Sequence, residues 1–121
     1  VNEVEGKGLA NVSSNRVEDV IAGLQKTYPN KEIILTVGSL GSYYICGETV
    51  IHQEAYRVDA VDTTAAGDTF TGFYLASILR GEEVNTALRI AAKASSITVT
   101  KEGAAKSIPT LEQVLESMKN V

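Results

Sequence analysis

Residues 61–72 read VDTTAAGDTFTG, and this stretch decides how the rest of the chain is interpreted. Three small residues, Ala65, Ala66 and Gly67, lead into a segment with helical spacing of apolar residues, and Asp68 falls in its first turn. The first N–H groups of a helix have no partner within it, and the helix dipole adds positive potential there. Small side chains let a ligand approach these groups closely, so the stretch predicts an anion site.

A carboxylate at such a site has a natural chemical task. Beside a bound phosphate it can take the proton from an attacking hydroxyl, while backbone amides stabilise the charge of a phosphoryl group in transfer. Asp68 is therefore a candidate general base. From the loop alone, the favoured interpretation is simpler: Asp68 only caps the helix, and Gly67 only permits a tight turn. A P-loop is excluded, because no G-x-x-x-x-G-K-[ST] string occurs in the chain.

Helical patterns lie on both sides of this stretch. We predict helices over residues 16–27, from the quoted loop to about residue 80, over 84–99, and from Thr110 onward. The residues Ser13, Ser14 and Asn15 offer caps for the first of these helices. Gly81 is the expected stop of the second, and Thr110 with Gln113 forms a capping box for the last.

Short apolar runs predict strands between the helices. Residues 33–37 are apolar and β-branched, which predicts a strand buried on both faces, as in a parallel sheet. Residues 43–46 and 49–53 flank Gly47-Glu48, a good two-residue hairpin turn. Residues 55–61 are expected to be extended. Strands followed by helices predict an α/β layered domain with one buried core.

Composition excludes several classes of protein. Of 121 residues, 44% are hydrophobic and 21% are charged, as in ordinary globular proteins, and the net charge is −4. The basic residues are scattered, which argues against a nucleic-acid surface. No apolar run approaches the roughly 20 residues of a membrane helix. The single cysteine, Cys46, cannot form an internal disulfide, and a reduced cytoplasmic setting fits best.

Residues 61–72 resemble the second signature of the ribokinase-type (PfkB) carbohydrate kinases. Three further segments resemble motifs of this family in the same order: the Asn-x-x-Glu motif at 2–5, the nucleotide loop at 36–41, and the segment over adenine and a monovalent cation at 99–109. The resemblance implies an α/β fold, the C-terminal part of a ribokinase-like, Rossmann-type layered fold. Family members are substantially longer, and their N-terminal half and β lid, with most sugar contacts, have no counterpart here.

The resemblance also implies a role for each matched residue. Asp68 would be the base, and the amides of residues 65–67 would form an anion hole. The nucleotide would be lined by Thr36, Val37, Gly38, Ser39, Leu40 and Gly41, together with Gly67 and Asp68. Magnesium would be held near Asn2 and Glu5, mostly through water. A monovalent cation, K⁺, would be bound, mostly by backbone carbonyls, at Asp62, Thr64, Thr98, Lys101, Gly103 and Ser107.

Simpler interpretations stand beside these roles. Residues 2–11 are polar and hold two glycines, which by themselves favour a frayed, solvated terminus. Gly38 and Gly41 are equally compatible with an ordinary turn that follows a strand and has no role in binding. His52 is expected at the surface without a catalytic role, and Cys46 in the core. Three tyrosines are expected to pack on the sheet: Tyr43, Tyr44 and Tyr56.

The implied reaction is phosphorylation of a sugar hydroxyl by ATP, with ribose O5 the first choice because of the Ala-Ala-Gly-Asp form. Fructose, a keto-deoxy sugar acid or a nucleoside are alternative substrates. A nucleotide-binding module without catalysis, or a structural fragment that acts within an assembly, are alternative functions, although a pure binder has no need of Asp68. The partners expected are the sugar and ATP, and a homodimer of the full-length protein. Residues 1–121 alone are expected to lack kinase activity.

Overall fold

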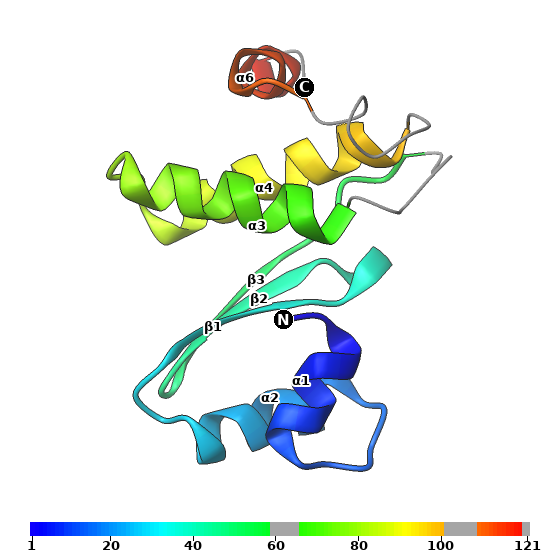
Figure 1. Cartoon of the computed structure of the whole chain (residues 1–121), viewed down its shortest axis with the longest axis vertical. Helices are drawn as coiled ribbons and strands as arrows, with labels where there is room; N and C mark the ends of the chain where they lie inside the picture. Colours follow the sequence, from blue (N-terminus) through cyan, green and yellow to red (C-terminus); the bar gives the residue numbers. More distant parts are fainter. Residues whose placement is uncertain (59–65, 101–108, 120–121) are drawn as a thin grey trace. The chain divides into compact units, whose positions relative to one another are not determined.

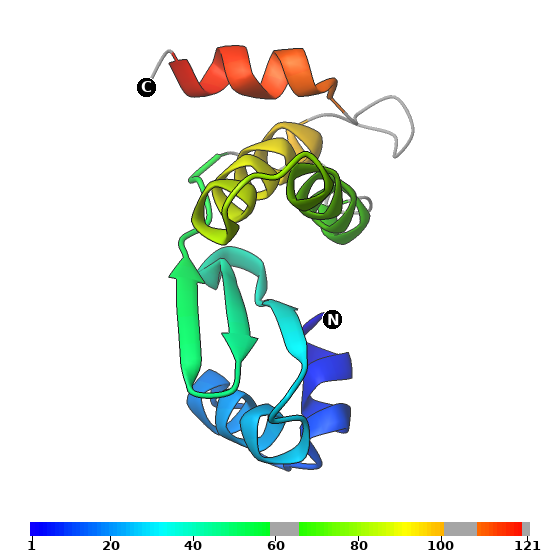
Figure 2. The same ribbon diagram turned by 90° about the vertical axis from the view of Figure 1, so that its left-hand side faces the viewer.

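The computed structural model describes residues 1–58, 66–100 and 109–119. The chain divides into two compact units, residues 1–52 and 53–121 (Figures 1 and 2). One cluster of buried apolar residues lies in the first unit and another lies in the second. None of the helices in the described part is long and apolar enough to cross a membrane.

The first unit combines two helices with a three-stranded sheet of order β1-β2-β3. Its elements are α1 (Glu3–Ala10), α2 (Val17–Thr27), β1 (Glu32–Thr36), the short 3₁₀ helix η1 (Gly38–Leu40), β2 (Ser42–Cys46) and β3 (Thr49–Gln53). Both helices contact the sheet and each other. The buried core between them consists of Ala10, Val20, Leu24, Leu35, Val37 and Ile45.

The direction of β1 differs from the prediction. β1 pairs antiparallel with β2, from Glu32 opposite Cys46 to Thr36 opposite Ser42. The connection from Thr36 at the end of β1 to Ser42 at the start of β2 is a short turn. A parallel neighbour would need a crossover of about a dozen residues or more. Burial on both faces is not found either, since Leu35 is the one fully buried residue of β1 and Ile33 and Ile34 are half-buried. β1 also has a parallel bridge between Asn2 and Thr36, where the Thr36 N–H donates to the Val1 carbonyl at 2.9 Å.

The predicted hairpin is confirmed. β2 and β3 flank Gly47 and Glu48, and Gly47 takes a φ of 58°, which glycine adopts without strain. Tyr44 is buried on β2, and its hydroxyl donates to Glu32 Oε1 at 2.6 Å. This bond and burial raise the pKa of Tyr44. Cys46 is only half-buried, so the expectation of a core position is wrong.

Two glycines allow the helices of the first unit to pack closely. A Cβ on Gly23 of α2 would come within 2.8 Å of the Ala10 side chain on α1. A Cβ on Gly6 of α1 would come within 2.7 Å of the Leu35 side chain on β1. At Gly23 the contacts are with the Cβ and the backbone carbonyl of Ala10, which cannot move aside, so packing requires glycine there. At Gly6 the contact is with the terminal methyl group of Leu35, which would have to shift.

In the described residues of the second unit the helices are α3 (Ala66–Leu79), α4 (Val84–Val99) and α6 (Leu111–Lys119). α3 lies along α4, and α6 contacts α4 (Figures 1 and 2). α4 has the predicted bounds, and four alanines on it are buried: Ala87, Ala91, Ala92 and Ala94. The core against α6 is formed by Ile90, Ala94 and Val114. The small side chains of α4 let neighbouring helices approach it closely.

The predicted helix ends are largely confirmed. Gly81 follows α3 with a φ of 90°. The Gln113 N–H donates to Thr110 Oγ1 at 3.2 Å and the Thr110 N–H donates to Gln113 Oε1 at 2.8 Å, which completes the capping box of α6. At α2 the N-cap is Arg16, which makes no side-chain cap bond. Ser14 instead accepts from the Arg16 N–H at 3.1 Å, two residues away.

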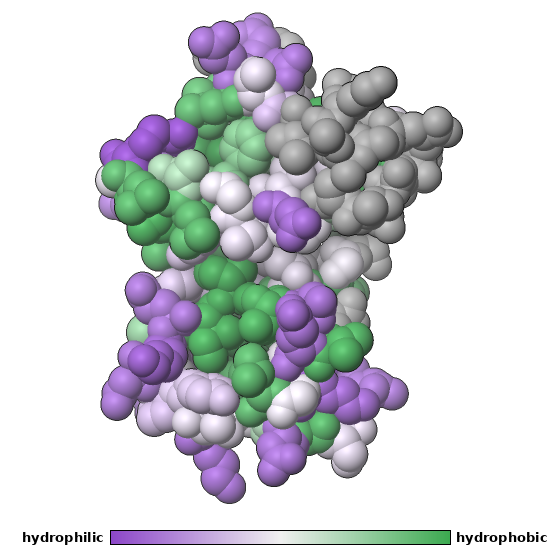
Figure 3. Space-filling model, viewed as in Figure 1, coloured by the Kyte–Doolittle hydropathy of each residue, from purple (hydrophilic) through white to green (hydrophobic). Residues whose placement is uncertain are grey.

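From the sequence, the segment before α3 is expected to be extended over residues 55–61. Residues 54–58 form no helix or paired strand, and residues 59–61 lie outside the described residues. The Lys93 ammonium lies 4.6 Å from the centre of the Tyr56 ring. α3 also exposes large apolar side chains, with Leu79 87% and Leu75 54% accessible, and apolar surface is visible over this helix in Figure 3.

Candidate functional site

The first turn of α3 presents the predicted base to solvent. α3 begins at Ala66, and Gly67 and Asp68 are both exposed. Among the described residues, a Cβ on Gly67 would meet no atom within 4 Å, and its φ is not in the left-handed region. Neither packing nor backbone conformation therefore requires glycine at this position. An open backbone surface beside an exposed carboxylate is compatible with a ligand that approaches the helix N-terminus.

The residues on either side of this exposed pair are held by α4. Ser95 Oγ donates to the Ala66 carbonyl at 3.2 Å. Thr98 Oγ1 donates to Thr69 Oγ1 at 3.2 Å, and both threonines are buried. The first turn of α3 is therefore fixed to α4 while its central residues stay accessible.

The predicted nucleotide loop, residues 36–41, is a compact turn. The Leu40 N–H donates to the Val37 carbonyl at 2.9 Å, and the Val37 N–H donates to the Gly41 carbonyl at 2.8 Å. Gly38 and Gly41 take φ values of 49° and 98°, so both glycines are needed for the conformation of the loop. Val37 is buried, whereas Gly38 is exposed and Leu40 is 58% accessible. The loop thus holds its shape through its own backbone and offers its outer side to solvent.

His52 supports this loop from β3. Its Nε2 lies 2.8 Å from the Leu40 carbonyl oxygen, and since a carbonyl can only accept, Nε2 carries the hydrogen. The His52 ring stacks on Tyr43 with the ring centroids 4.4 Å apart. The imidazole is exposed, as predicted, but it also fixes one end of the nucleotide loop.

Residues 2–11 form a capped helix, so the interpretation as a frayed terminus is wrong. The Glu5 N–H donates to Asn2 Oδ1 at 2.9 Å, and the Asn2 N–H donates to Glu5 Oε1 at 3.0 Å. The predicted magnesium residues are therefore the two halves of a capping box. Each side chain already uses one oxygen for a backbone N–H, and both are exposed. A role through metal-bound water fits this geometry better than direct chelation.

The predicted cation residues lie mostly outside the described residues. This holds for Asp62, Thr64, Lys101, Gly103 and Ser107, and also for Ala65 of the anion hole. Thr98 is described, near the end of α4, and its side chain is buried. Within the described ranges no three His, Cys, Asp or Glu side chains come together as a metal cluster. The roles of these residues stay predictions.

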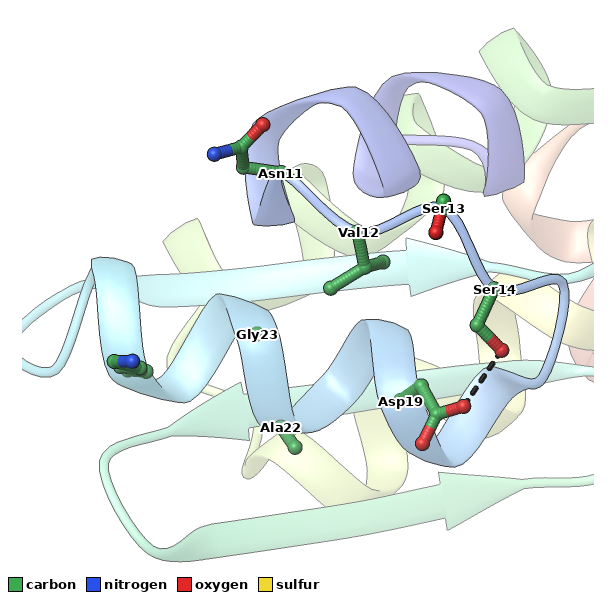
Figure 4. Close-up of a pocket in the computed structure, with 8 residues that line it drawn as sticks. Asn11, Val12, Ser13, Ser14, Asp19, Ala22 and Gly23 are labelled. Carbon is green, nitrogen blue, oxygen red and sulfur yellow. Dashed lines mark hydrogen bonds between the residues drawn. The ribbon is translucent and has the colours of Figure 1, made fainter.

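Two surface hollows lie in the first unit. The larger, of about 480 Å³, is lined by the α1–α2 connection and α2, and includes Asp19, which accepts from the Ser14 hydroxyl at 2.6 Å (Figure 4). It contains no predicted site residue. The smaller, of about 360 Å³, is bordered by Val37 and Leu40 of the nucleotide loop and by Lys7 of α1. Only the smaller hollow therefore touches a segment with a predicted role.

Sequence reasoning missed Ser95, Thr69 and His52 as parts of these sites. Ser95 and Thr69 are small polar residues on helices, and their types alone do not indicate which neighbour they will bond. His52 was assigned to the hairpin correctly, but its distance in sequence from Leu40 concealed their contact. Pairing of the three-stranded sheet brings the two together.

Comparison with known proteins gives one family. Residues 1–111 match the model described as pfkB family carbohydrate kinase. The ribokinase of Schizosaccharomyces pombe is 50% identical over 86 residues, which cover 69% of this chain and 27% of that protein. The ribokinase of Arabidopsis thaliana is 34% identical over 122 residues, which cover 98% of this chain and 32% of that protein.

Solved structures give the same result. The structure of Arabidopsis thaliana ribokinase complexed with ribose and ATP superposes with a TM-score of 0.90 at 33% identity, and the match covers 98% of this chain and 39% of that one. An E. coli structure named as a ribokinase II, in complex with ATP and Mg²⁺, matches with a TM-score of 0.85 at 28% identity and 38% coverage of that chain. The present chain thus corresponds to well under half of each of these proteins.

Proposed function

The chain belongs to the pfkB family of carbohydrate kinases, and from this premise we propose that it serves in the transfer of the γ-phosphoryl group of ATP to a sugar hydroxyl. The family match over residues 1–111 carries the proposal. The exposed Asp68 beside the open backbone of Gly67 supports it, because the reaction needs a base next to a phosphate site.

In the proposed mechanism Asp68 accepts the proton of the sugar hydroxyl as the oxygen attacks the γ-phosphorus. The bond between this phosphorus and the β–γ bridging oxygen breaks, and ADP leaves. Free amides at the first turn of α3, including that of Gly67, stabilise the negative charge on the phosphoryl oxygens. The loop of residues 36–41 binds the nucleotide, held in shape by its own hydrogen bonds and by His52.

Magnesium is proposed to accompany ATP, as in the E. coli structure. When bound, Mg²⁺ neutralises part of the charge of the phosphates. On this chain Glu5 is suited to orient metal-bound water, because Oε1 accepts from the Asn2 N–H and leaves the second carboxylate oxygen for solvent. Asn2 holds α1 in place for this task through the capping box.

Ribose, phosphorylated at O5, is the proposed substrate. The proteins named ribokinase among the relatives support this choice, and the Ala-Ala-Gly-Asp form of the loop agrees with it. A panel of ribose, fructose, a keto-deoxy sugar acid and a nucleoside, assayed with ATP and the gene product that carries this sequence, tests the choice. The highest kcat/KM is expected for ribose, and a clear preference for another acceptor would reassign the substrate.

Replacement of Asp68 tests the reaction itself. Asp68→Asn keeps the size of the side chain but removes the base, so turnover should fall by about 10²–10⁴-fold while nucleotide binding is retained. Calorimetric titration with an ATP analogue checks the binding. Asp19→Asn, at the hollow that contains no predicted site residue, is the matched control and should keep full turnover. Normal turnover of Asp68→Asn would rule out Asp68 as the base.

Activation by potassium is part of the proposal. This is supported by the sequence, because Thr98 and several residues outside the described ranges match cation-binding positions of the family. In the family these positions lie next to the loop before α3. A cation there would fix the shape of the anion hole. Rates in potassium buffer should exceed those in sodium-only buffer, and equal rates would remove the cation from the mechanism.

A further inference from the structure

Two hydrogen bonds between α3 and α4 bracket the exposed residues of the proposed catalytic loop. Ser95 Oγ on α4 donates to the Ala66 carbonyl, and Thr98 Oγ1 donates to Thr69 Oγ1, each at 3.2 Å. Ala66 immediately precedes the exposed pair Gly67 and Asp68, and Thr69 immediately follows it.

The spacing of these contacts matches on the two helices. Ser95 and Thr98 are three residues apart on α4, and Ala66 and Thr69 are three residues apart on α3. Residues with this spacing lie on the same side of a helix, one turn apart. The two bonds therefore join one turn of α3 to one turn of α4 at two points, which opposes both rotation and sliding of the first turn.

The hydrogen bond between Thr98 and Thr69 is buried and therefore protected from competition by water. Thr69 is 3% and Thr98 is 1% accessible, so neither hydroxyl can exchange its partner for bulk water without opening the interface. The buried residues elsewhere along α4 are mainly alanine and other apolar residues. Apolar contacts are non-directional and do not by themselves fix the angle of a helix about its axis. The hydrogen bonds of Ser95 and Thr98 are directional, so they fix the orientation of α3 at its first turn, where the proposed chemistry takes place.

We propose that Ser95 and Thr98 are positioning residues for phosphoryl transfer. They hold the first turn of α3 so that the Gly67 N–H and the Asp68 carboxylate keep a fixed direction toward the reacting groups. Neither side chain touches the reacting atoms. This inference rests on the proposed function, because an orientation matters only if Asp68 is the base. Misplacement of a catalytic group by a fraction of an ångström to 1 Å lowers the rate markedly.

The test compares four variants of the gene product that carries this sequence: Ser95→Ala, Thr98→Val, Ser96→Ala and Asp68→Asn. Ser96 is the matched control, since it is a buried serine on the same helix whose hydroxyl donates to the Lys93 carbonyl of its own helix at 2.6 Å. Ser95→Ala and Thr98→Val should each lower kcat by about threefold to tenfold, the effect of losing one hydrogen bond. KM for ATP should stay within about twofold, because the nucleotide loop is unchanged. Ser96→Ala should keep the kcat of the unmodified protein.

A hydroxyl-retaining variant separates positioning from simple loss of packing. Ser95→Thr and Thr98→Ser keep the donor and should restore most of kcat relative to the alanine and valine variants. A kcat in Ser95→Ala or Thr98→Val equal to that of Ser96→Ala would overturn the assignment of that residue. The outcome for Asp68→Asn is read separately. Normal turnover there refutes the role of Asp68 as the base, on which the positioning role depends, whereas loss of turnover there with normal Ser95→Ala and Thr98→Val refutes only the positioning role.

Discussion

Replacement of Gly67 by alanine should raise stability and abolish most activity. At Gly23 of this chain a Cβ is forbidden, because it would come within 2.8 Å of the Ala10 side chain and 3.0 Å of the Ala10 carbonyl oxygen. At Gly67 a Cβ would meet nothing within 4 Å, and the backbone does not need a positive φ. The folded chain therefore tolerates alanine there, and the space that the methyl group would enter is the space proposed for the phosphoryl group.

The expected gain in stability follows from helix propensity. Alanine is favoured over glycine by about 0.8–1.0 kcal/mol in a helix interior, and somewhat less in the first turn. A gain of about 0.5 kcal/mol raises the midpoint of thermal unfolding by about 2 °C for a chain of this size. The expected loss of activity is larger. A methyl group that keeps the phosphoryl oxygens away from one amide donor should lower kcat by about 10²-fold, the usual cost of losing such a donor.

The assay pairs thermal unfolding, followed by circular dichroism, with steady-state kinetics on the gene product that carries this sequence. Gly8→Ala is the control, because a Cβ on Gly8 of α1 would also meet nothing within 4 Å and Gly8 has no proposed role. It should gain stability and keep full turnover. A lower unfolding midpoint for Gly67→Ala would show that the fold needs this glycine. Unchanged turnover would show that no substrate group occupies the space in front of it.

Three other substitutions probe the first unit. His52→Phe keeps a ring beside Tyr43 but loses the donor to the Leu40 carbonyl, so KM for ATP should rise by about threefold to tenfold with little change in kcat, as ATP titrations would reveal. Asn2→Ala should lower the free energy of unfolding by about 1 kcal/mol through loss of the N-cap, whereas Asn2→Ser should retain it, as measured by urea unfolding. Leu24→Ala, at a fully buried position between α2 and the sheet, should cost about 2–5 kcal/mol in the same measurement, and a loss under 1 kcal/mol would contradict the core described here.

Local signals made several elements predictable. α4 begins and ends where the spacing of its apolar residues indicated, and α6 begins at the Thr110–Gln113 capping box. The β2–β3 hairpin follows from Gly47 and its neighbour. In each case the bonds that define the element connect residues within a few positions of one another. The motif at 61–72 indicated the family for the same reason, since a contiguous string carries it, and the family match over residues 1–111 agrees.

α1 is a helix that the pattern of apolar residues does not predict. Among its residues from Val4 to Ala10, only Gly6 and Ala10 are buried, so the helix has almost no apolar stripe to detect. It is stabilised by the reciprocal bonds of Asn2 and Glu5 and by close packing of Gly6 on Leu35. The capping box is local and was present in the sequence as Asn-x-x-Glu. The packing is not local, because it needs β1 to lie beneath the helix.

From local patterns alone the helices after residue 16, the hairpin, the family and the place of Asp68 in the first turn of a helix could be predicted, whereas α1 could not. The antiparallel pairing of β1 with β2, the bond from His52 to the Leu40 carbonyl, and the bonds from Ser95 and Thr98 to the first turn of α3 depend on the folded structure. The physical reason is the range of the interactions. Helix and turn hydrogen bonds form between near neighbours in the chain, whereas a serine, threonine or histidine side chain bonds whichever group the packing of distant segments brings within about 3 Å of it.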